Sequence, residues 1–183
     1  NGLSQVARAG KLLTGSSPNQ IISSDLSRAY STAKALADIV SLEITTDKRL
    51  RETDGGNWEG KTGDVIREID IENFIRWIDG DDNPAGDVGE RRSEVAERAT
   101  TAIYEALAGK TNQTLVVATH GGTARCILGS MLNLPMSTWG SIGGLSNASW
   151  SIISTTPKGW NLVEHNSGSL PEPIFGEESG GEK

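Results

Sequence analysis

The segment LVVATHGGTAR, residues 115–125, decides the predicted fold of this 183-residue chain. An apolar run at 114–119 is typical of a central parallel strand that is covered on both faces. His120 follows this run, and two glycines lead into the apolar spacing of a helix. Ligands of open α/β sheets bind beyond the carboxyl ends of the strands, where the start of a helix also favours an anion. We therefore predict a phosphate site at His120, as an imidazolium, and Gly121; the alternative is a structural histidine beside a Gly-Gly turn.

A similar arrangement occurs earlier, in IISSDLSRAYSTA, residues 21–33. A short β-branched strand ends at the two serines, and a helix begins with Arg28 in its first turn. The helix dipole opposes a cation at this end, so helix stability does not explain Arg28. Its guanidinium can instead hold a phosphate in the same crevice with two donors. The alternative is an ordinary surface arginine on the polar face of the helix.

The glycine-rich segment RLRETDGGNWEG, residues 49–60, contains a third candidate, Glu52. The loop has too many glycines to form core, so its acidic side chain could lie in the crevice. A carboxyl group that is shielded from water there can act as a general acid. Asp54 and Glu59 are alternative acids in the same loop, and a plain solvated side chain is the alternative for all three.

Hydrophobic periodicity elsewhere predicts one α/β domain with a mainly parallel sheet. Helices are predicted at about 3–13, 26–40 and 92–108, with weaker ones around 65–69 and 74–78, and strands at 20–23 and 43–46. An antiparallel hairpin is predicted from 148–154 and 160–165.

Composition narrows the function classes. The net charge of −7 argues against a nucleic-acid surface. No apolar run approaches the roughly 20 residues that a membrane span needs. The single cysteine, Cys126, excludes an internal disulfide and a CxxC site, and two histidines make a zinc site improbable. We expect no metal, no cofactor, no nucleic-acid or membrane partner, structural roles for Cys126 and His165, and a cytoplasmic location.

Four segments in order, SDLSRAYSTA, LRETDGGNWEG, GERRSEVAER and VVATHGG, resemble the histidine phosphatase (phosphoglycerate-mutase-like) superfamily. The likeness covers nearly the whole chain to about Trp160, and residues 134–150 (LPMSTWGSIGGLSNASW) resemble an actinobacterial branch that acts on glucosyl-3-phosphoglycerate. The resemblance implies a three-layer αβα sandwich with a mainly parallel central sheet. It also implies a phosphohistidine mechanism that requires no metal.

By the same resemblance, Arg28 is a phosphate-binding arginine, Glu52 is the proton donor and His120 is the second pocket histidine. The family's Arg-His-Gly motif, which carries the nucleophile, belongs on a strand before the first helix, and residues 1–183 do not contain it. We therefore expect that strand upstream of residue 1, so that residues 1–166 form an N-terminally incomplete histidine phosphatase domain and 167–183 form a disordered tail. Gly89-Glu90-Arg91 departs from the family's frequent Gly-Glu-Ser, which leaves the role of Glu90 open.

The expected function is a metal-independent phosphomonoesterase that acts on a small sugar phosphate or phosphoglycerate derivative. Mutases of the family usually resemble ERHYG after the acid and carry a longer insertion, whereas here the connection from Glu52 to Gly89 is short. A phosphoglycerate mutase and a catalytically inactive phosphate-binding or interaction domain are the alternatives. The expected partner is the small phosphorylated substrate, and a homodimer remains an open alternative to a monomer.

Overall fold

The computed structural model describes residues 2–168, so all but the first two residues of the predicted tail, 167–183, lie outside the described residues. Helices are α1 (Gly2–Leu13), α2 (Ser27–Val40), α3 (Gly63–Ile69), α4 (Ile71–Asp79), α5 (Arg92–Leu107) and α6 (Gly121–Met131). Strands are β1 (Gln20–Ser23), β2 (Ile44–Thr46), β3 (Leu115–Ala118), β4 (Trp150–Thr156) and β5 (Gly159–Ser167). The predicted helices, strands and terminal hairpin are therefore confirmed, with small shifts at their ends.

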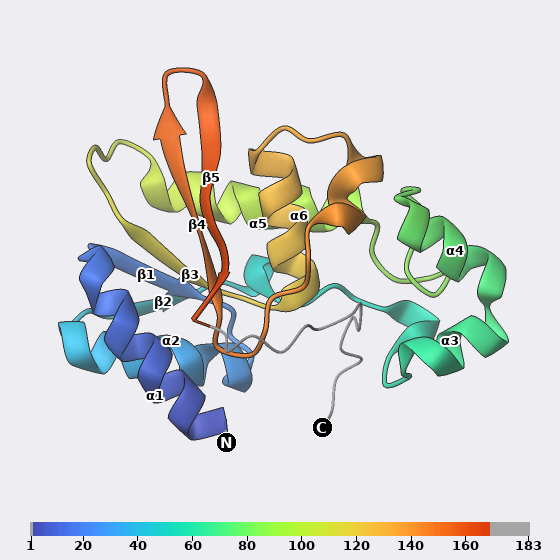
Figure 1. The fold of residues 1–183 in the computed structure, drawn as a ribbon, viewed down its shortest axis with the longest axis horizontal. Helices are drawn as coiled ribbons and strands as arrows, with labels where there is room; N and C mark the ends of the chain where they lie inside the picture. The colour runs from blue at the N-terminus through green and yellow to red at the C-terminus, as the bar shows by residue number, and fades with distance from the viewer. Residues whose placement is uncertain (1, 169–183) are drawn as a thin grey trace.

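The first three strands form a parallel sheet in the order β2-β1-β3, as predicted. Successive residues of β1 point to opposite faces, so Ile21 packs with α2 and Ile22 packs with α5 and α6. Figure 1 shows α1 and α2 on one side of this sheet and α5 and α6 on the other. The three-layer arrangement of the prediction is confirmed.

Strand β3 differs from its prediction as a fully covered central strand. All four of its residues are only half-buried, and within residues 2–168 it pairs with one strand, β1. Beyond its other edge lies the antiparallel hairpin β4–β5, which forms a separate two-stranded sheet. Val117 and Ile153 pack on the same core cluster from these two sheets, and both line a large cavity between them. The apolar run is thus a strand with one uncovered edge.

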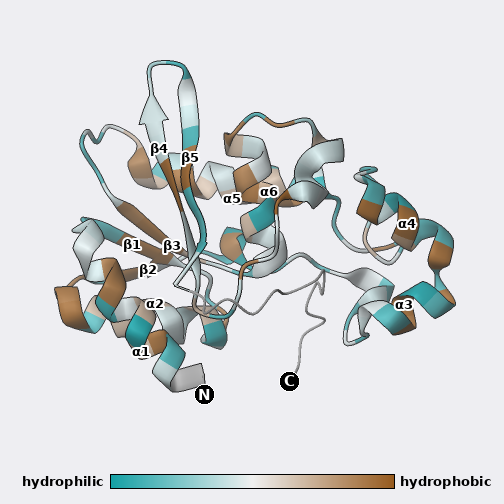
Figure 2. Cartoon of the chain, in the orientation of Figure 1, coloured by the Kyte–Doolittle hydropathy of each residue, from teal (hydrophilic) through white to brown (hydrophobic). Residues whose placement is uncertain are grey.

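Helices α3 and α4 form a smaller unit with its own core. Trp58 packs edge-on against Phe74 and Trp77, with ring centroids 6.0 and 5.9 Å apart. Both helices also carry exposed apolar residues, among them Ile69 on α3 and Ile75 on α4. Both therefore show brown segments in Figure 2. In the described part of the chain, no helix has the length and hydrophobicity to cross a membrane.

Candidate active site

The sheet topology brings the predicted site residues to one edge. Strands β1 and β3 are parallel, and the backbone N–H of Ser24 donates to the carbonyl oxygen of Ala118 at 2.8 Å where the two strands end. The residues that follow both strands therefore lie side by side. This places Ser24 and Arg28, after β1, next to His120, after β3.

His120 is held by two side chains. The Nε of Arg28 donates to His120 Nδ1 at 3.0 Å, and His120 Nε2 lies 2.9 Å from Ser24 Oγ. A guanidinium has only donors, so Nδ1 must be the acceptor and the ring proton is assigned to Nε2. The geometry therefore selects the neutral tautomer whose Nε2–H donates to Ser24.

The electrostatic surroundings favour the same neutral form. Burial lowers the pKa of His120, which is 7% exposed. The negative charge of Glu52 acts in the opposite direction, and the cations of Arg28 and Arg98 lower the pKa further. The net shift is downward, so these surroundings favour neutral His120 over the predicted imidazolium. A phosphate that bound here would supply the negative charge that a protonated His120 needs.

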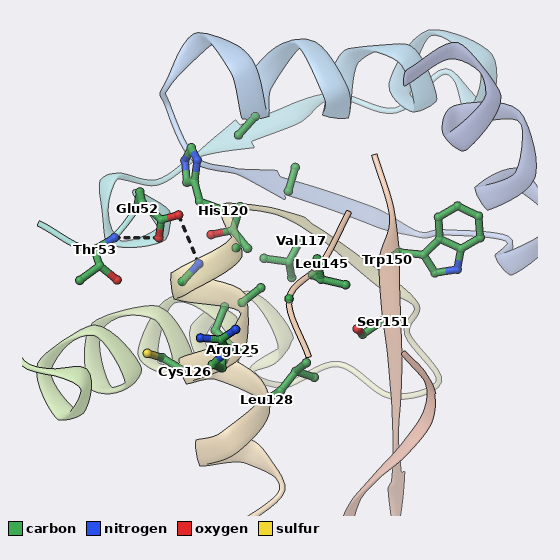
Figure 3. A pocket seen from close by; sticks show the side chains of 18 of the residues that line it. Glu52, Thr53, Val117, His120, Arg125, Cys126, Leu128, Leu145, Trp150 and Ser151 are labelled. Carbon is green, nitrogen blue, oxygen red and sulfur yellow. Dashed lines mark hydrogen bonds between the residues drawn. The ribbon is translucent and has the colours of Figure 1, made fainter. Parts of the chain in front are cut away.

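Glu52 reaches the same edge from the loop that follows β2, and its carboxylate caps helix α6. Its oxygens accept from the N–H groups of Gly122 at 3.2 Å and Thr123 at 3.0 Å. The N–H of Thr53 adds a bond of 2.9 Å. Figure 3 shows Glu52 over the first turn of α6, with His120 beside it. The carboxylate thus occupies the helix N-terminus at which the sequence predicts an anion.

The two alternative acids of the loop serve the loop itself. Asp54 accepts from the N–H of Gly56 at 2.9 Å, and Glu59 accepts from the N–H of Gly55 at 2.8 Å. Glu52 is the one of the three whose carboxylate bonds to α6. The placement therefore favours Glu52 over Asp54 and Glu59.

The two glycines after His120 differ in the space around them. A Cβ on Gly121 would meet no atom within 4 Å, so its backbone faces open space in which a ligand can approach. A Cβ on Gly122 would lie 2.8 Å from the Glu52 carboxylate. The space beside Gly121 is thus open, whereas Gly122 leaves room for the Glu52 carboxylate.

The remaining candidates have structural surroundings. Cys126 is buried beside Val95 and Trp139. His165 bonds to Ser151 on the neighbouring strand and to the carbonyl oxygen of Gly143. Among the described residues, no cluster of three or more histidine, cysteine, aspartate or glutamate side chains is arranged to hold a metal ion.

Two residues of the site escaped the sequence analysis. Ser24 orients the ring of His120. In the sequence, however, a serine just before a helix is equally typical of a helix cap. Arg98 donates to the backbone carbonyl oxygen of Glu52 at 3.2 Å, although 46 residues separate them. The segment GERRSEVAER contains Arg98, but its spacing does not show where that side chain ends.

Comparisons with known proteins agree with the geometry. The family described as the histidine phosphatase superfamily (branch 1) matches residues 1–168. A glucosyl-3-phosphoglycerate phosphatase of Mycobacterium tuberculosis (strain ATCC 25618 / H37Rv) is 34% identical over 161 residues, which are 84% of this chain and 72% of the relative. Phosphoserine phosphatase 1 of Hydrogenobacter thermophilus is 32% identical over 133 residues, 73% of this chain and 63% of the relative.

A solved structure shows the same fold. The native structure of a mycobacterial glucosyl-3-phosphoglycerate phosphatase superposes with a TM-score of 0.81 at 31% identity, over 91% of this chain and 86% of that one. The resemblance predicted from the four motifs is confirmed. The chain belongs to the histidine phosphatase superfamily, and it is a phosphatase of the hydrolase class.

Proposed function

We propose that this enzyme hydrolyses a small phosphate monoester without a metal, through a phosphohistidine intermediate. The observation that carries the proposal is the convergence of Arg28, His120 and Glu52 at the carboxyl edge of the sheet. Arg28 and His120 supply donors for phosphoryl oxygens, and Glu52 supplies an oxygen that can carry a proton. These are the parts that phosphoryl transfer needs for positioning and charge stabilisation.

The proposed reaction has two steps. In the first, an imidazole nitrogen attacks phosphorus, the bond from phosphorus to the ester oxygen breaks, and Glu52 gives a proton to the departing alkoxide. In the second, Glu52 takes a proton from water, the water oxygen attacks phosphorus, and the phosphorus–nitrogen bond breaks. The products are the free alcohol and inorganic phosphate.

The nucleophilic histidine is proposed to lie on a strand upstream of residue 1. The cavity between the β3 edge and β4 supports this, since Val117 on β3 and Trp150 and Ser151 on β4 line it from different sides (Figure 3). A strand there, parallel to β3, would end beside His120. The backbone N–H and C=O groups of such a strand would pair with those on the uncovered edge of β3.

The path of the chain also supports this strand. Three residues, 17–19, separate the short turn after α1 from β1, so α1 ends near the amino end of β1. Its first residues lie toward the carboxyl end of that strand (Figure 1). A strand beyond β3 followed by α1 would cross the sheet in the same direction and on the same face as β1–α2–β2. Both crossovers would then have the same, right-handed sense.

The proposed substrate class is a sugar phosphate or phosphoglycerate derivative, with glucosyl-3-phosphoglycerate as the first compound to test. This rests on the names of the relatives at 34% identity and on the short connection between Glu52 and Gly89.

The test is release of inorganic phosphate by the full-length protein, in the presence of a chelator, from glucosyl-3-phosphoglycerate, phosphoserine and 3-phosphoglycerate. Phosphate release with an acid-labile, base-stable phosphoenzyme is the expected result. Transfer of the phosphoryl group within phosphoglycerate, without release, would identify a mutase instead. Tight phosphate binding without turnover would identify a non-catalytic binding domain.

A further inference from the structure

The segment that carries Glu52 is held by side chains rather than by a neighbouring strand. It follows β2 and leaves the sheet, so its backbone carbonyl oxygens need other donors. The Thr119 hydroxyl donates to the carbonyl of Leu50, and the Thr123 hydroxyl to that of Arg51, both at 2.7 Å. Arg98, on α5, supplies the rest of the support.

Arg98 uses all five of its N–H donors on this segment and on Glu90. Nη1 donates to the carbonyl oxygens of Arg49 at 2.5 Å and Arg51 at 2.9 Å. Nη2 donates to the carbonyl oxygen of Glu52 at 3.2 Å and to Glu90 Oε2 at 2.7 Å. Nε completes the set with Glu90 Oε1 at 2.6 Å. A guanidinium has five donors in a fixed plane, so this arrangement fits arginine and no other side chain.

Glu90 holds the segment on the other side of Glu52. Its Oε2 also accepts from the backbone N–H of Asp54 at 2.9 Å, and its own N–H donates to the carbonyl oxygen of Asp54 at 2.9 Å. Burial raises the pKa of Glu90, but the hydrogen bonds from Arg98 and from the Asp54 N–H outweigh it, so the net shift is downward. Arg98 and Glu90 thus form an ion pair whose two side chains bond to the backbone on both sides of Glu52.

Close backbone packing fixes the same two loops against each other. A Cβ on Gly89 would lie 2.3 Å from the carbonyl oxygen of Asp54, and a Cβ on Gly86 would lie 2.5 Å from that of Gly55. Residues 54–57 and 85–90 therefore meet backbone to backbone. This contact brings Glu90 within reach of both Asp54 and Arg98.

We propose that Arg98 and Glu90 are positioning residues that fix the Glu52 carboxylate for proton transfer to the leaving group. The proposal rests on the proposed function, in which Glu52 gives that proton. It assigns a role to Glu90 in the segment where this chain departs from the usual family pattern. A displacement of about 1 Å at a reacting group can cost roughly 100-fold in rate, so a loose Glu52 would lower turnover without removing the phosphate site.

The test uses leaving groups of different quality in the full-length protein. Arg98→Lys keeps the charge and removes the five-donor plane. For an alkyl phosphate, we expect a fall in kcat/KM of about 10- to 100-fold, because its alkoxide needs a proton. For 4-nitrophenyl phosphate, whose phenolate leaves without one, we expect a change below about threefold, the same selective pattern as in Glu52→Gln. Arg76→Lys, at an exposed ion pair with Asp81, is the matched control and should change neither.

A general structural role for Arg98 predicts equal losses with both substrates, and that result would overturn the proposal. So would an Arg98→Lys penalty that persists undiminished in a Glu52→Gln background, because positioning cannot act through an acid that is absent. Should Arg98→Lys fail to fold, Glu90→Gln gives the same comparison, with equal losses again refuting the role. A Glu52→Gln enzyme with full activity would instead refute the acid assignment in the proposed function, which is a distinct outcome.

Discussion

Replacing Glu52 with glutamine is expected to destabilise the folded protein as well as to slow the reaction. Oε1 accepts from the N–H groups of Thr53 and Thr123, whereas Oε2 accepts from the Gly122 N–H. A glutamine keeps one oxygen, so the Oε1 contacts survive, but its NH2 group then faces the Gly122 N–H. One hydrogen bond to a charged group and the favourable interaction with the helix dipole are lost.

The magnitude follows from these two losses. A hydrogen bond to a charged group contributes about 1.5–3 kcal/mol, and a charge at a helix N-terminus about 0.3–1 kcal/mol. The Gly122 bond is long, at 3.2 Å, so the low ends apply. The free energy of unfolding should fall by about 2 kcal/mol.

Urea unfolding of the full-length protein measures this directly, as a lower midpoint with an unchanged slope. Glu59→Gln is the matched control, since Glu59 accepts one N–H within the exposed loop and should change stability by less than about 0.5 kcal/mol. A Glu52→Gln protein as stable as the wild type, or no less stable than the control, would refute the capping role.

Three further outcomes are expected. The pKa of His120 is lowered in the folded protein, so the free energy of unfolding should be highest above about pH 6.5 and should fall as the pH drops below it. The urea midpoint of His120→Asn should fall less over the same pH range, and an equal fall in both proteins would contradict this. Arg28→Ala should weaken competitive inhibition by inorganic phosphate roughly 10- to 100-fold, because charged donors are lost, whereas an unchanged inhibition constant would remove Arg28 from the phosphate site. Gly129→Ala should lower the free energy of unfolding by about 1–3 kcal/mol, measured by thermal unfolding, because its Cβ would lie 2.5 Å from the Trp139 ring. Gly15→Ala is the control, since a Cβ there meets no atom within 4 Å, and an equal cost for both variants would show that the Trp139 ring can move.

The parts of the fold and site that the sequence predicted depend on local patterns. A β-branched or apolar run followed by polar residues and a helical period places Arg28 and His120 at strand ends without any knowledge of distant contacts. Because parallel strands end at one edge, their proximity follows from topology alone. The hairpin was equally local, since its two strands adjoin one short turn.

The parts that were missed depend on contacts across the chain. The sequence predicts Glu52 as an acid in the crevice, but not that its carboxylate caps a helix 70 residues further along, nor that Arg98 reaches carbonyl groups up to 49 residues back. Backbone carbonyl acceptors exist at every residue, so no residue type marks them in a sequence. The half-burial of β3 differs from the prediction for a related reason, because an apolar run indicates burial but not which chain segment provides it.

The separate core around Trp58 has a consequence for how such an enzyme can diversify. The side chains of Trp58, Phe74 and Trp77 pack on one another and on Ile66 and Ala85, apart from the clusters that support the sheet. This cluster is joined to the rest of the protein through α5, where the Arg92 guanidinium lies over the Trp77 ring at 4.4 Å from its centroid. We therefore expect substitutions inside this separate cluster to change the preference for the alcohol portion of the substrate more than the ability to hydrolyse a phosphate ester.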